Sequence, residues 1–484
     1  MRRRDFLASI AATGLASLTG CDAAAPGVPP GELLGTSLAL GHRLRQPDFP
    51  EPTETRRVPV AIIGGGVGGL SAGWKLDKAG FKDSLLLELE SEVGGNSRSG
   101  RNAVSAYPLG AHYLPLPTRE ATATRELLAE LGVLQGDPRA SRPRYYERYL
   151  CSTPQERLFR HGMLQEVLLP NAGVSAAERE QHRRFQDTVG RYREQRDRQG
   201  KRAFAVPMEL SSRDPELLAL DRVTMRDWLL SQGFDSPTLH WYVDYTCRDD
   251  FGAGSEVVSA WAGIHYFACR DGEAEDAASD VVLTAPEGNA WLMRGLARRV
   301  EGRVQHGALV HRFHDNGREI EIDVWLAGEQ RSLRIVAQQA VWAAPLYLLP
   351  HIWQGAAELK AAAKSYSHAP WLVANLTLDH LPEERAGAPL AWDNVLYGNN
   401  SLGYVVATHQ QMRLRTGATV FTYYRAIADR SPSAGREWLL NIPREGWAEQ
   451  ILAELSVPHP DIRQRVTRLD VMRYGHAMAR PTPG

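Results

Sequence analysis

The sequence predicts an α/β fold that contains a Rossmann-type dinucleotide-binding domain. An apolar segment, Val58 to Ile63, leads into the run Gly64-x-Gly66-x-x-Gly69 and then into a helix. A second apolar segment ends on Glu88, twenty-four positions after Gly64. A strand, a glycine-rich turn, a helix and a strand that ends on an acidic residue form the βαβ unit that binds a dinucleotide.

The glycines of the first turn have separate physical roles. Gly64 permits the tight turn between strand and helix, Gly66 lets the backbone approach a pyrophosphate, and Gly69 lets the helix pack close to the sheet. The helix is expected over Leu70 to Ala79, with free N–H groups at its start facing the phosphates. The same run adds two further expected cofactor contacts, Gly65 and Gly68.

The second strand and a second glycine turn specify the dinucleotide. Ser84 to Leu87 places Glu88 where its carboxylate can accept hydrogen bonds from a ribose diol. Gly94 and Gly95, six and seven positions later, and Asn96 after them are further expected cofactor contacts. This pattern resembles the flavin-containing amine oxidoreductases, the family of monoamine and polyamine oxidases, protoporphyrinogen oxidase and phytoene desaturases. The resemblance implies FAD, whereas Glu88 alone would also suit an NAD-linked dehydrogenase.

The same resemblance implies where the rest of the cofactor site lies. The segment from Tyr107 to Pro115 resembles the one beneath the flavin ring, with Gly110, Ala111 and His112 as contacts. His112 has an ordinary pKa of about 6.5 and suits an acid or base, but a hydrogen-bonded structural histidine is favoured. Val310 matches the position whose backbone meets the adenine, and Ala340 to Pro345 resembles the strand that closes the FAD domain.

We expect a discontinuous FAD-binding domain and an α+β substrate domain. The predicted division is a signal peptide (1–21), a Pro-rich tether or irregular wrapping segment (22–57, with 35–45 against the body), a first FAD-binding segment (58–116), a helical first substrate segment (117–282), a second FAD-binding segment (283–346), a second substrate segment (347–470) and a C-terminal FAD-binding segment (471–484). Predicted strands in the second half are 304–313, 320–324, 333–336, 372–378, 402–407, 418–424 and 466–473, with helices over 286–300 and 438–455.

Helices are expected in the first substrate segment at 118–134, 176–201, 225–230, 241–248 and 257–270. The last two carry aromatic side chains at helical spacing, for which a core role is favoured over a wall around a substrate. These residues are Trp241, Tyr242, Tyr245, Trp261, Tyr266 and Phe267, with His265 among them. The neighbouring Arg248-Asp249-Asp250 is predicted to be either a polar pocket wall or a helix cap region.

The chain departs from the family pattern in three places. The strand expected over Trp371 to Leu378 has no lysine, although relatives use a lysine there in the reaction with oxygen. Asn96-Ser97 stands where amine oxidases usually have arginine, and Arg98 comes two positions late. The chain stops at Gly484, where the resemblance places a glycine-rich segment, so we expect a truncated end and leave open whether this chain binds FAD.

The N-terminus resembles a bacterial export signal. Arg3-Arg4 is followed by an apolar stretch, Phe6 to Leu18, that is too short to span a hydrocarbon core of about 30 Å as a helix. The arginine pair resembles a twin-arginine signal, and Leu18 to Cys21 resembles a lipobox in which Cys21 carries lipid. We therefore expect a chain exported in folded form and anchored on the periplasmic side of the cytoplasmic membrane.

Charge and cysteine content exclude several other classes of protein. The net charge is −1, and no basic stripe with interleaved aromatics indicates a nucleic-acid partner. Besides Cys21, the chain has Cys151, Cys247 and Cys269, whose spacings match no zinc pattern, so no metal site is expected. We interpret these three as buried thiols, with a pair between Cys247 and Cys269 as the less favoured alternative.

The sequence thus indicates an FAD-dependent oxidoreductase that moves a hydride from a small amine or C–C substrate to flavin N5. The missing lysine favours a dehydrogenase or desaturase, with an electron acceptor other than or besides oxygen, over an oxidase. An incomplete nucleotide-binding scaffold and an NAD-linked dehydrogenase are the alternatives. The substrate, the catalytic residues and the oligomeric state are not specified by the sequence.

Overall fold

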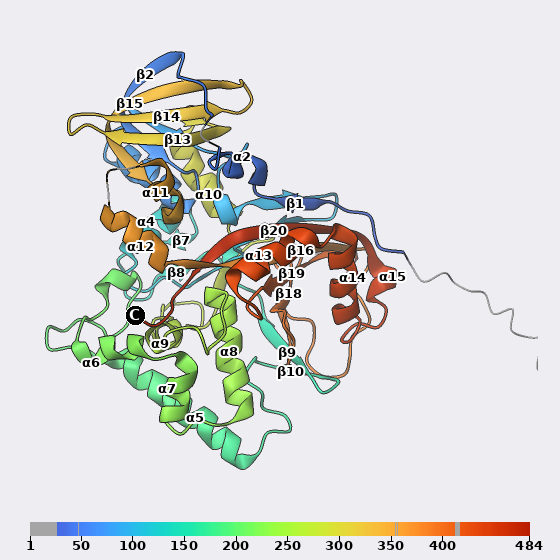
Figure 1. Cartoon of the computed structure of the whole chain (residues 1–484). Helices are drawn as coiled ribbons and strands as arrows, with labels where there is room; N and C mark the ends of the chain where they lie inside the picture. The colour runs from blue at the N-terminus through green and yellow to red at the C-terminus, as the bar shows by residue number, and fades with distance from the viewer. Residues whose placement is uncertain (1–26, 47, 354, 356, 412–416) are drawn as a thin grey trace, which may run out of the picture.

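The computed structural model describes residues 27–46, 48–353, 355, 357–411 and 417–484. The predicted signal, with Arg3-Arg4 and Cys21, lies outside the described residues. Figure 1 shows two sheets, one around β2 and β15 and the other around β16 and β20, with a group of helices beyond the second sheet. No described helix combines the length and the apolar character that a membrane span requires.

The six-stranded sheet is the Rossmann-type sheet. Its order is β12 (Val304–Gln305), β3 (Ser84–Leu87), β2 (Glu54–Ile63), β15 (Arg331–Trp342), β14 (Ile320–Leu326) and β13 (Ala308–Asp315). The first four strands are parallel, and β14 and β13 continue the sheet as antiparallel strands. The expected α/β fold with a Rossmann-type domain is therefore confirmed.

Alternating side chains of β2 separate the two faces of this sheet. Ile62 packs on the face covered by α3 (Val67–Lys78) and α10 (Ala290–Ala297). Ala61 and Ile63 point to the other face, where they share a core with side chains of α11 (Leu349–Ile352). Period-two alternation buries both faces of a parallel sheet in this way.

The eight-stranded sheet forms the second body. Its order is β1 (Leu33–Gly35), β20 (Val466–Arg480), β16 (Ser367–Leu378), β19 (Thr419–Ala426), β18 (Gly403–Val406), β17 (Asp393–Leu396), β9 (Glu156–Arg160) and β10 (Met163–Glu166). One face packs on α13 (Pro432–Asn441), α14 (Arg444–Leu455) and α15 (Ile462–Arg465). The other face packs on α8 (Pro237–Phe251).

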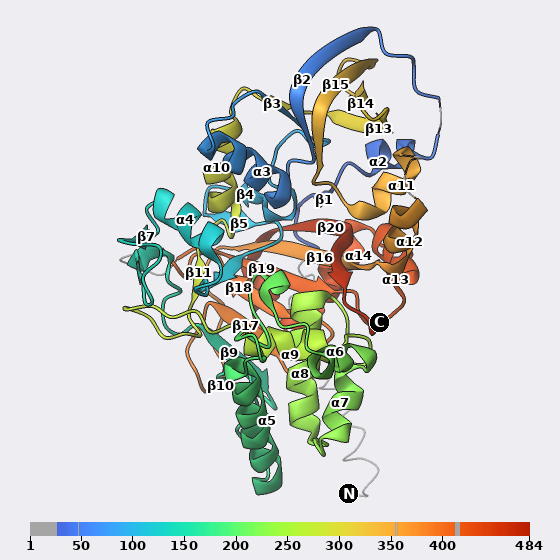
Figure 2. The ribbon, with the colours of Figure 1, turned by 90° about the vertical axis from the view of Figure 1, so that its left-hand side faces the viewer.

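A third core lies within the helical region. It is built by α5 (Ala176–Glu194), α6 (Pro215–Leu218), α7 (Met225–Ser231), α8 and α9 (Ala260–Ala268). Figure 2 shows these helices on the side of the eight-stranded sheet away from α3 and α10. The smaller elements are α2 (Leu38–Arg43), β4 (Ser99–Arg101), β5 (Ala106–Pro108), β6 (Tyr113–Pro115), α4 (Thr122–Glu130), β7 (Leu134–Gln135), β8 (Arg144–Tyr145), β11 (Val282–Thr284) and α12 (Ala357–Ser365).

The segment predicted as a Pro-rich tether is structured over much of its length. β1 pairs in parallel with β20, and β2 begins at Glu54. Between them, the backbone N–H and the hydroxyl of Ser37 both donate to the Glu90 carboxylate at 2.8 Å. Ser37 thus lies against the body, as the wrapping alternative predicts, and residues 54–57 belong to β2 and not to a tether.

Other elements differ from the sequence-based expectation for local reasons. The strand expected over 304–313 is divided into β12 and β13, because Gly307 adopts a positive φ of 64° between them. The helix expected over 438–455 is two helices, and Pro443 caps the second. Residues 471–480, expected in a C-terminal FAD-binding segment, continue β20, whose partner β16 pairs with it out to Arg480.

Residues 347–365 also differ from their expected place. The sequence predicts them on the substrate side, but Leu349 and Ile352 of α11 pack in the core of the Rossmann-type sheet. In the reverse sense, the first substrate segment is not all helical, because β9 and β10 join the eight-stranded sheet. The positions of α11 and of β9 and β10 depend on contacts with residues far along the chain, which local periodicity does not predict.

Candidate functional site

The first glycine turn brings α3 against the end of β2. Gly64 has a φ of 105°, and its N–H donates to the Leu87 carbonyl at 2.8 Å. A side chain on Gly69 would overlap the Gly64 carbonyl oxygen, so this contact requires glycine. Gly66 is the N-cap of α3, and no side chain caps the helix there. The N–H groups and positive dipole end of the helix therefore remain available to an anion.

Glu88 is oriented by the same turn. Its side chain is buried, with 8% of its surface exposed, and accepts hydrogen bonds from Gly65 N–H at 2.6 Å and Glu90 N–H at 2.8 Å. Burial raises the pKa of this carboxyl, and the two backbone donors act in the opposite direction. Each carboxylate oxygen accepts one of these bonds, which leaves acceptor capacity for a hydroxyl of a ligand.

The second glycine turn is joined directly to the first. Gly94 and Gly95 have φ values of 119° and 55°, in the region that favours glycine. Gly94 N–H donates to the Gly65 carbonyl at 2.8 Å, and a Cβ on Gly95 would lie 3.2 Å from Gly66 Cα. The two turns therefore form one backbone cradle.

Asn96 connects this cradle to the segment from Gly110 to His112. Its carbonyl accepts from Ala111 N–H at 2.8 Å, and a side chain on Gly110 would overlap that carbonyl. The Asn96 amide donates to the Ala477 carbonyl of β20 at 3.0 Å. Residues expected to contact the two ends of one cofactor are thus held together by hydrogen bonds.

His112 lies among aromatic side chains of the eight-stranded sheet. Its ring stacks on Tyr424 at a centroid distance of 4.4 Å and lies 5.4 Å from Trp392. Desolvation lowers the pKa of His112 to about 3, against a smaller opposing effect of a hydrogen bond with the Gly110 backbone. The imidazole is therefore neutral near pH 7, which agrees with the favoured structural role and not with a charged acid.

Val310 and Arg98 stand at the edges of the cradle. Val310 is buried in β13, and two residues earlier Ala308 N–H donates to the Glu88 carbonyl at 2.9 Å. The β13–β14 pairing shifts register just after Val310. Arg98 Nε donates to the Gly95 carbonyl at 3.3 Å, and its guanidinium lies 3.9 Å from the Glu90 carboxylate. Arg98 thus lies beside the glycine turn although it follows the usual arginine position by two residues.

A polar network connects this segment to the helical region. The Tyr113 hydroxyl donates to Asp249 at 3.4 Å and accepts from Arg270 at 3.1 Å. Arg270 also pairs with Asp250 at 2.6 Å. Residues 248–250 lie in the last turn of α8 before its C-cap Gly252, which agrees with the helix cap prediction, and both aspartates also belong to this polar network.

Sequence reasoning missed two carboxyl groups near this network. Asp393 of β17 and Glu156 of β9 are partners in the parallel pairing of these strands. Burial raises the pKa of each, and Asp249 and Glu156 raise that of Asp393 further. A strand that begins with an acidic residue is the available signal in both cases, but it does not indicate that the two strands are neighbours.

The aromatic stripe is divided between two environments. Trp241, Tyr242 and Tyr245 pack beside Trp392 at the sheet, whereas Phe267 belongs to the helical core. Cys151, Cys247 and Cys269 are buried and free, and burial raises the pKa of each thiol. The three are therefore buried thiols, and Cys247 does not pair with Cys269.

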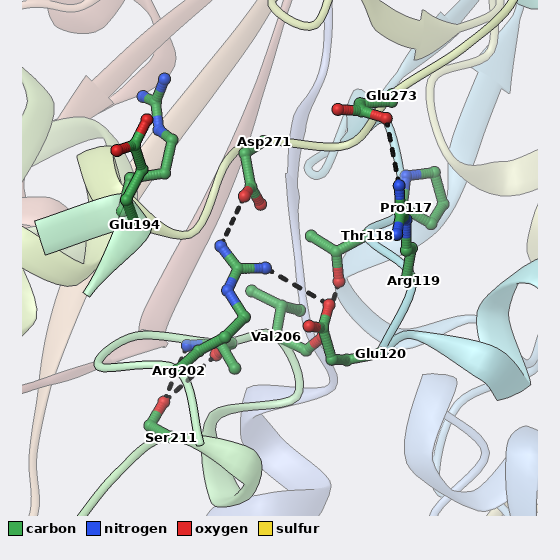
Figure 3. A network of polar contacts seen from close by, with 12 residues as sticks. Pro117, Thr118, Arg119, Glu120, Glu194, Arg202, Val206, Ser211, Asp271 and Glu273 are labelled. Carbon is green, nitrogen blue, oxygen red and sulfur yellow. Dashed lines mark hydrogen bonds and ion pairs between the residues drawn. The ribbon is translucent and has the colours of Figure 1, made fainter. Parts of the chain in front are cut away.

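A second polar network lies away from the cradle and is paired on both sides. Figure 3 shows Arg202 between Glu120 and Asp271, at 3.3 and 2.5 Å. The hydroxyl of Thr118 donates to the Val206 carbonyl at 3.0 Å. Because the guanidinium is buried and has two carboxylate partners, this network holds residues 118–120 against the helical region and leaves Arg202 no free charge for an anionic ligand.

The strand that lacks the expected lysine is β16. It contacts the segment before Gly110 through Asn375, whose buried amide donates to the Pro108 carbonyl at 3.2 Å. Thr422 donates to the Asn375 oxygen at 2.8 Å. Lys364 lies on α12, outside this strand. β16 therefore presents an amide here and no ammonium group.

Comparison with known sequences identifies the nucleotide-binding unit. A family model described as an NAD(P)-binding Rossmann-like domain matches residues 62–131. Polyamine oxidase 7 from Oryza sativa subsp. japonica is 40% identical over 60 residues, which cover 12% of this chain and 13% of that protein. The match therefore spans a small part of the curated relative, well under two thirds of its length.

Comparison with solved structures extends the likeness to most of the chain. Wild-type putrescine oxidase bound to putrescine has a TM-score of 0.62 and 16% identity, with 87% of this chain and 84% of that chain covered. Cyclohexylamine oxidase from Brevibacterium oxydans has a TM-score of 0.60, 13% identity and 88% coverage of both chains. A putative protoporphyrinogen oxidase from Exiguobacterium sp. has a TM-score of 0.58, 12% identity and coverage of 90% and 89%. At these identities the likeness shows a shared fold.

Proposed function

We propose that this chain is an FAD-dependent oxidoreductase of the amine oxidoreductase type, which removes a hydride from a small amine. The joined cradle, in which Gly94 N–H donates to Gly65 and Asn96 accepts from Ala111, carries this proposal. It extends the dinucleotide turn towards the aromatic residues around His112, as a cofactor with a flavin ring needs. The matched fold of putrescine and cyclohexylamine oxidases supports the same class.

The residues present fit the ADP half of FAD. Glycine is required at Gly64 and Gly69 by a positive φ and a backbone contact, and a Cβ at Gly66 would meet no atom within 4 Å. Space at the start of α3 is what a pyrophosphate group requires. Glu88 would hold the ribose diol, the α3 N-terminus would hold the phosphates, and Arg98 would neutralise phosphate charge. FAD, when bound, supplies a ring that accepts a hydride and passes the electrons on.

The remaining work falls to residues of the chain. A side chain at Gly110 would overlap the Asn96 carbonyl, so glycine is required there, and Gly110 and Ala111 would offer backbone to the ring. His112, neutral and stacked on Tyr424, packs the site without adding charge. The Tyr424 hydroxyl donates to the Gly110 carbonyl at 3.0 Å and fixes the two segments relative to each other. These aromatic side chains exclude water and orient the substrate.

An acceptor other than or besides oxygen is included in the proposal. β16 offers Asn375 near the segment beneath the ring and has no lysine, which favours a dehydrogenase or desaturase over an oxidase. The description of the family model supports the alternative of an NAD-linked dehydrogenase, whereas the second glycine turn favours FAD. The export signal, with Cys21 as lipid attachment site, supports a membrane-anchored enzyme on the periplasmic side.

Flavin content tests this function. The purified full chain should show flavin absorbance after reconstitution with FAD, and an amine should bleach it anaerobically. Glu88→Ala should weaken FAD binding by about tenfold or more, because it removes a charge-assisted acceptor. Glu92→Ala, in the same loop but beyond the cradle, is the matched control. A chain that retains no FAD under any reconstitution, or equal retention by Glu88→Ala and the unchanged protein, would contradict the proposal.

A further inference from the structure

Arg43 and Phe49 cover part of the face of β13–β15 that points away from the core shared with α11. Arg43, the last residue of α2, lies over the Trp325 ring at 4.2 Å and over the Phe49 ring at 5.0 Å. Phe49 in turn stacks on His311 at a centroid distance of 4.1 Å. Trp325 and Ser332 are directly opposite in the antiparallel pairing of β14 and β15, so their side chains lie on the same face of the sheet. We define the Arg43 site as Arg43, His311, Trp325 and Ser332.

The polar atoms of the Arg43 site are buried and lack hydrogen-bond partners. Trp325 and Ser332 are 3% and 0% exposed, but Trp325 Nε1 and Ser332 Oγ form no hydrogen bond among the described residues. Arg43 Nε and His311 Nε2 are buried and without a partner in the same part of the chain. Buried polar atoms in native proteins are rarely left unpaired. Four such atoms at one place therefore indicate a bound group that the described chain does not supply.

The chemistry of these atoms specifies an acceptor as the bound group. Trp325 Nε1 and Arg43 Nε can only donate hydrogen bonds. The Ser332 hydroxyl can donate as well, and His311 Nε2 donates in one of the two neutral tautomers. A ligand that accepts from all four atoms satisfies the whole site.

The charge of Arg43 specifies that this acceptor is an anion. Among the described residues its guanidinium contacts the Phe49 and Trp325 rings and forms no ion pair. Asp323, which lies two residues before Trp325 on the same strand face, is already paired with Arg312 at 3.1 Å and with Arg334 at 2.7 Å. A cation that is partly removed from water needs a counter-charge.

We propose that the Arg43 site binds one small inorganic anion of the size of chloride. The four polar atoms are shielded from solvent, which restricts the ligand to a small one. The anion would hold α2 and Phe49 on β13–β15, because Arg43 comes from the segment before β2 and the other donors come from the three strands. The site lies apart from the glycine cradle and needs no FAD, so this inference goes beyond the proposed function and can fail independently of it.

Thermal unfolding of the FAD-free full chain tests for the anion. Sodium gluconate is replaced stepwise by sodium chloride at constant ionic strength, so that charge screening stays the same. Gluconate is too large for an enclosed site of this kind. The midpoint of unfolding should rise with chloride by about 2 °C or more and then level off, because an anion that binds only the folded state stabilises it. A midpoint that does not depend on chloride would overturn the inference.

Variants assign the chloride effect to this site. Arg43→Gln should abolish the chloride-dependent shift, and Ser332→Ala, which removes a single oxygen atom from the core, should reduce it at least by half. Arg45→Gln makes the same replacement at an exposed arginine two residues later and should keep the full shift. Equal shifts in Arg43→Gln and Arg45→Gln would contradict the assignment.

Crystals of the full chain grown with bromide locate the ion directly. Anomalous scattering should place one bromide within hydrogen-bond distance of Trp325 Nε1 and Ser332 Oγ. A water molecule at that position in the presence of bromide would overturn the inference. Bromide at the site without any thermal shift from chloride would identify an adventitious ion only, and would overturn it as well.

Discussion

Glu88 is a buried carboxyl group and Asp249 a part-buried one, and their surroundings differ in the form of the acid that they favour. Glu88 has two backbone N–H donors that favour its charged form. Asp249 has the Tyr113 hydroxyl at 3.4 Å as its hydrogen-bond donor and Asp250 as a neighbour of like charge. Glu88 is therefore suited to accept bonds from a neutral diol, whereas the charged form of Asp249 is disfavoured.

The environment of Asp249 predicts a pH-dependent gain in stability for Asp249→Asn. Desolvation and Asp250 raise the pKa of Asp249 to about 6, and Arg270, Tyr113 and Arg248 oppose this change. An aspartate in an unfolded chain has a pKa of about 3.9. Ionisation of Asp249 therefore lowers the free energy of unfolding progressively from about pH 4 to pH 6, and the full decrease is present above pH 6.

The asparagine variant avoids this cost. Its free energy of unfolding should exceed that of the unchanged protein by about 1–3 kcal/mol at pH 8, and the difference should vanish below pH 4. Thermal unfolding across that range, with Asp379→Asn as control, measures it. A variant that is less stable than the unchanged protein at pH 8 would show that Asp249 is held by a favourable contact and not by burial.

Residues of the cradle could be predicted from sequence, whereas the meeting of Asp249, Asp393 and Glu156 could not. Gly64 to Gly95 lie within one βαβ unit, so their spacing encodes their geometry. In the sequence, Asp249 stands out only as a member of a charged tripeptide. Asp393 and Glu156 meet because β17 pairs with β9, a non-local contact that single-sequence patterns do not contain. The hydrogen bond from the Asn96 amide to the Ala477 carbonyl is likewise a non-local contact that the sequence does not predict.

Among elements, α3 shows how one position can control the packing of a whole helix. Gly68 and Gly69 are neighbours in its first turn, but a Cβ on Gly68 would meet only the Ala343 Cβ, at 3.8 Å. A Cβ on Gly69 would overlap the backbone carbonyl of Gly64 and lie 3.3 Å from the Ile62 side chain. The close approach of α3 to β2 is therefore a property of Gly69 and not of Gly68.

This difference predicts opposite results for two alanine substitutions. Gly69→Ala should lower the free energy of unfolding by about 1–3 kcal/mol, because the backbone must move to admit the methyl group. Gly68→Ala should leave it unchanged or raise it by up to about 1 kcal/mol through helix propensity. Denaturant unfolding of the FAD-free chain compares them without any cofactor effect. Equal stability of the two variants would mean that α3 does not pack on β2 as described.

The elements that sequence patterns locate well are the locally determined ones. Ser84–Leu87 has the expected bounds, and α3 begins three residues before its expected start. Elements that depend on distant partners are located less well. β1 forms only because β20 offers an edge, and β20 extends to Arg480 because β16 pairs with it. Regular pairing along a long partner continues a strand past a sequence whose own strand signal is weak.

On the scale of the whole molecule, the candidate site joins the two sheets. Asn96 on the Rossmann side bonds to Ala477 of β20, Asn375 of β16 bonds to Pro108, and Tyr424 of β19 bonds to Gly110. A cofactor held by the cradle would therefore contact both bodies. We expect such a chain to take up its cofactor as it folds, before any transport across a membrane.

We therefore predict that a bacterial host exports the full chain in the folded state. Replacing Arg3 and Arg4 together by lysine should retain the precursor in the cytosol, because a twin-arginine signal is read through both arginines. Arg2→Lys makes the same replacement outside the arginine pair and is the matched control. Fractionation and immunoblotting of periplasm, membrane and cytosol measure the outcome. If the lysine pair reached the periplasm as efficiently as the unchanged precursor, the chain would use another export route, and cofactor uptake before export would lose its support.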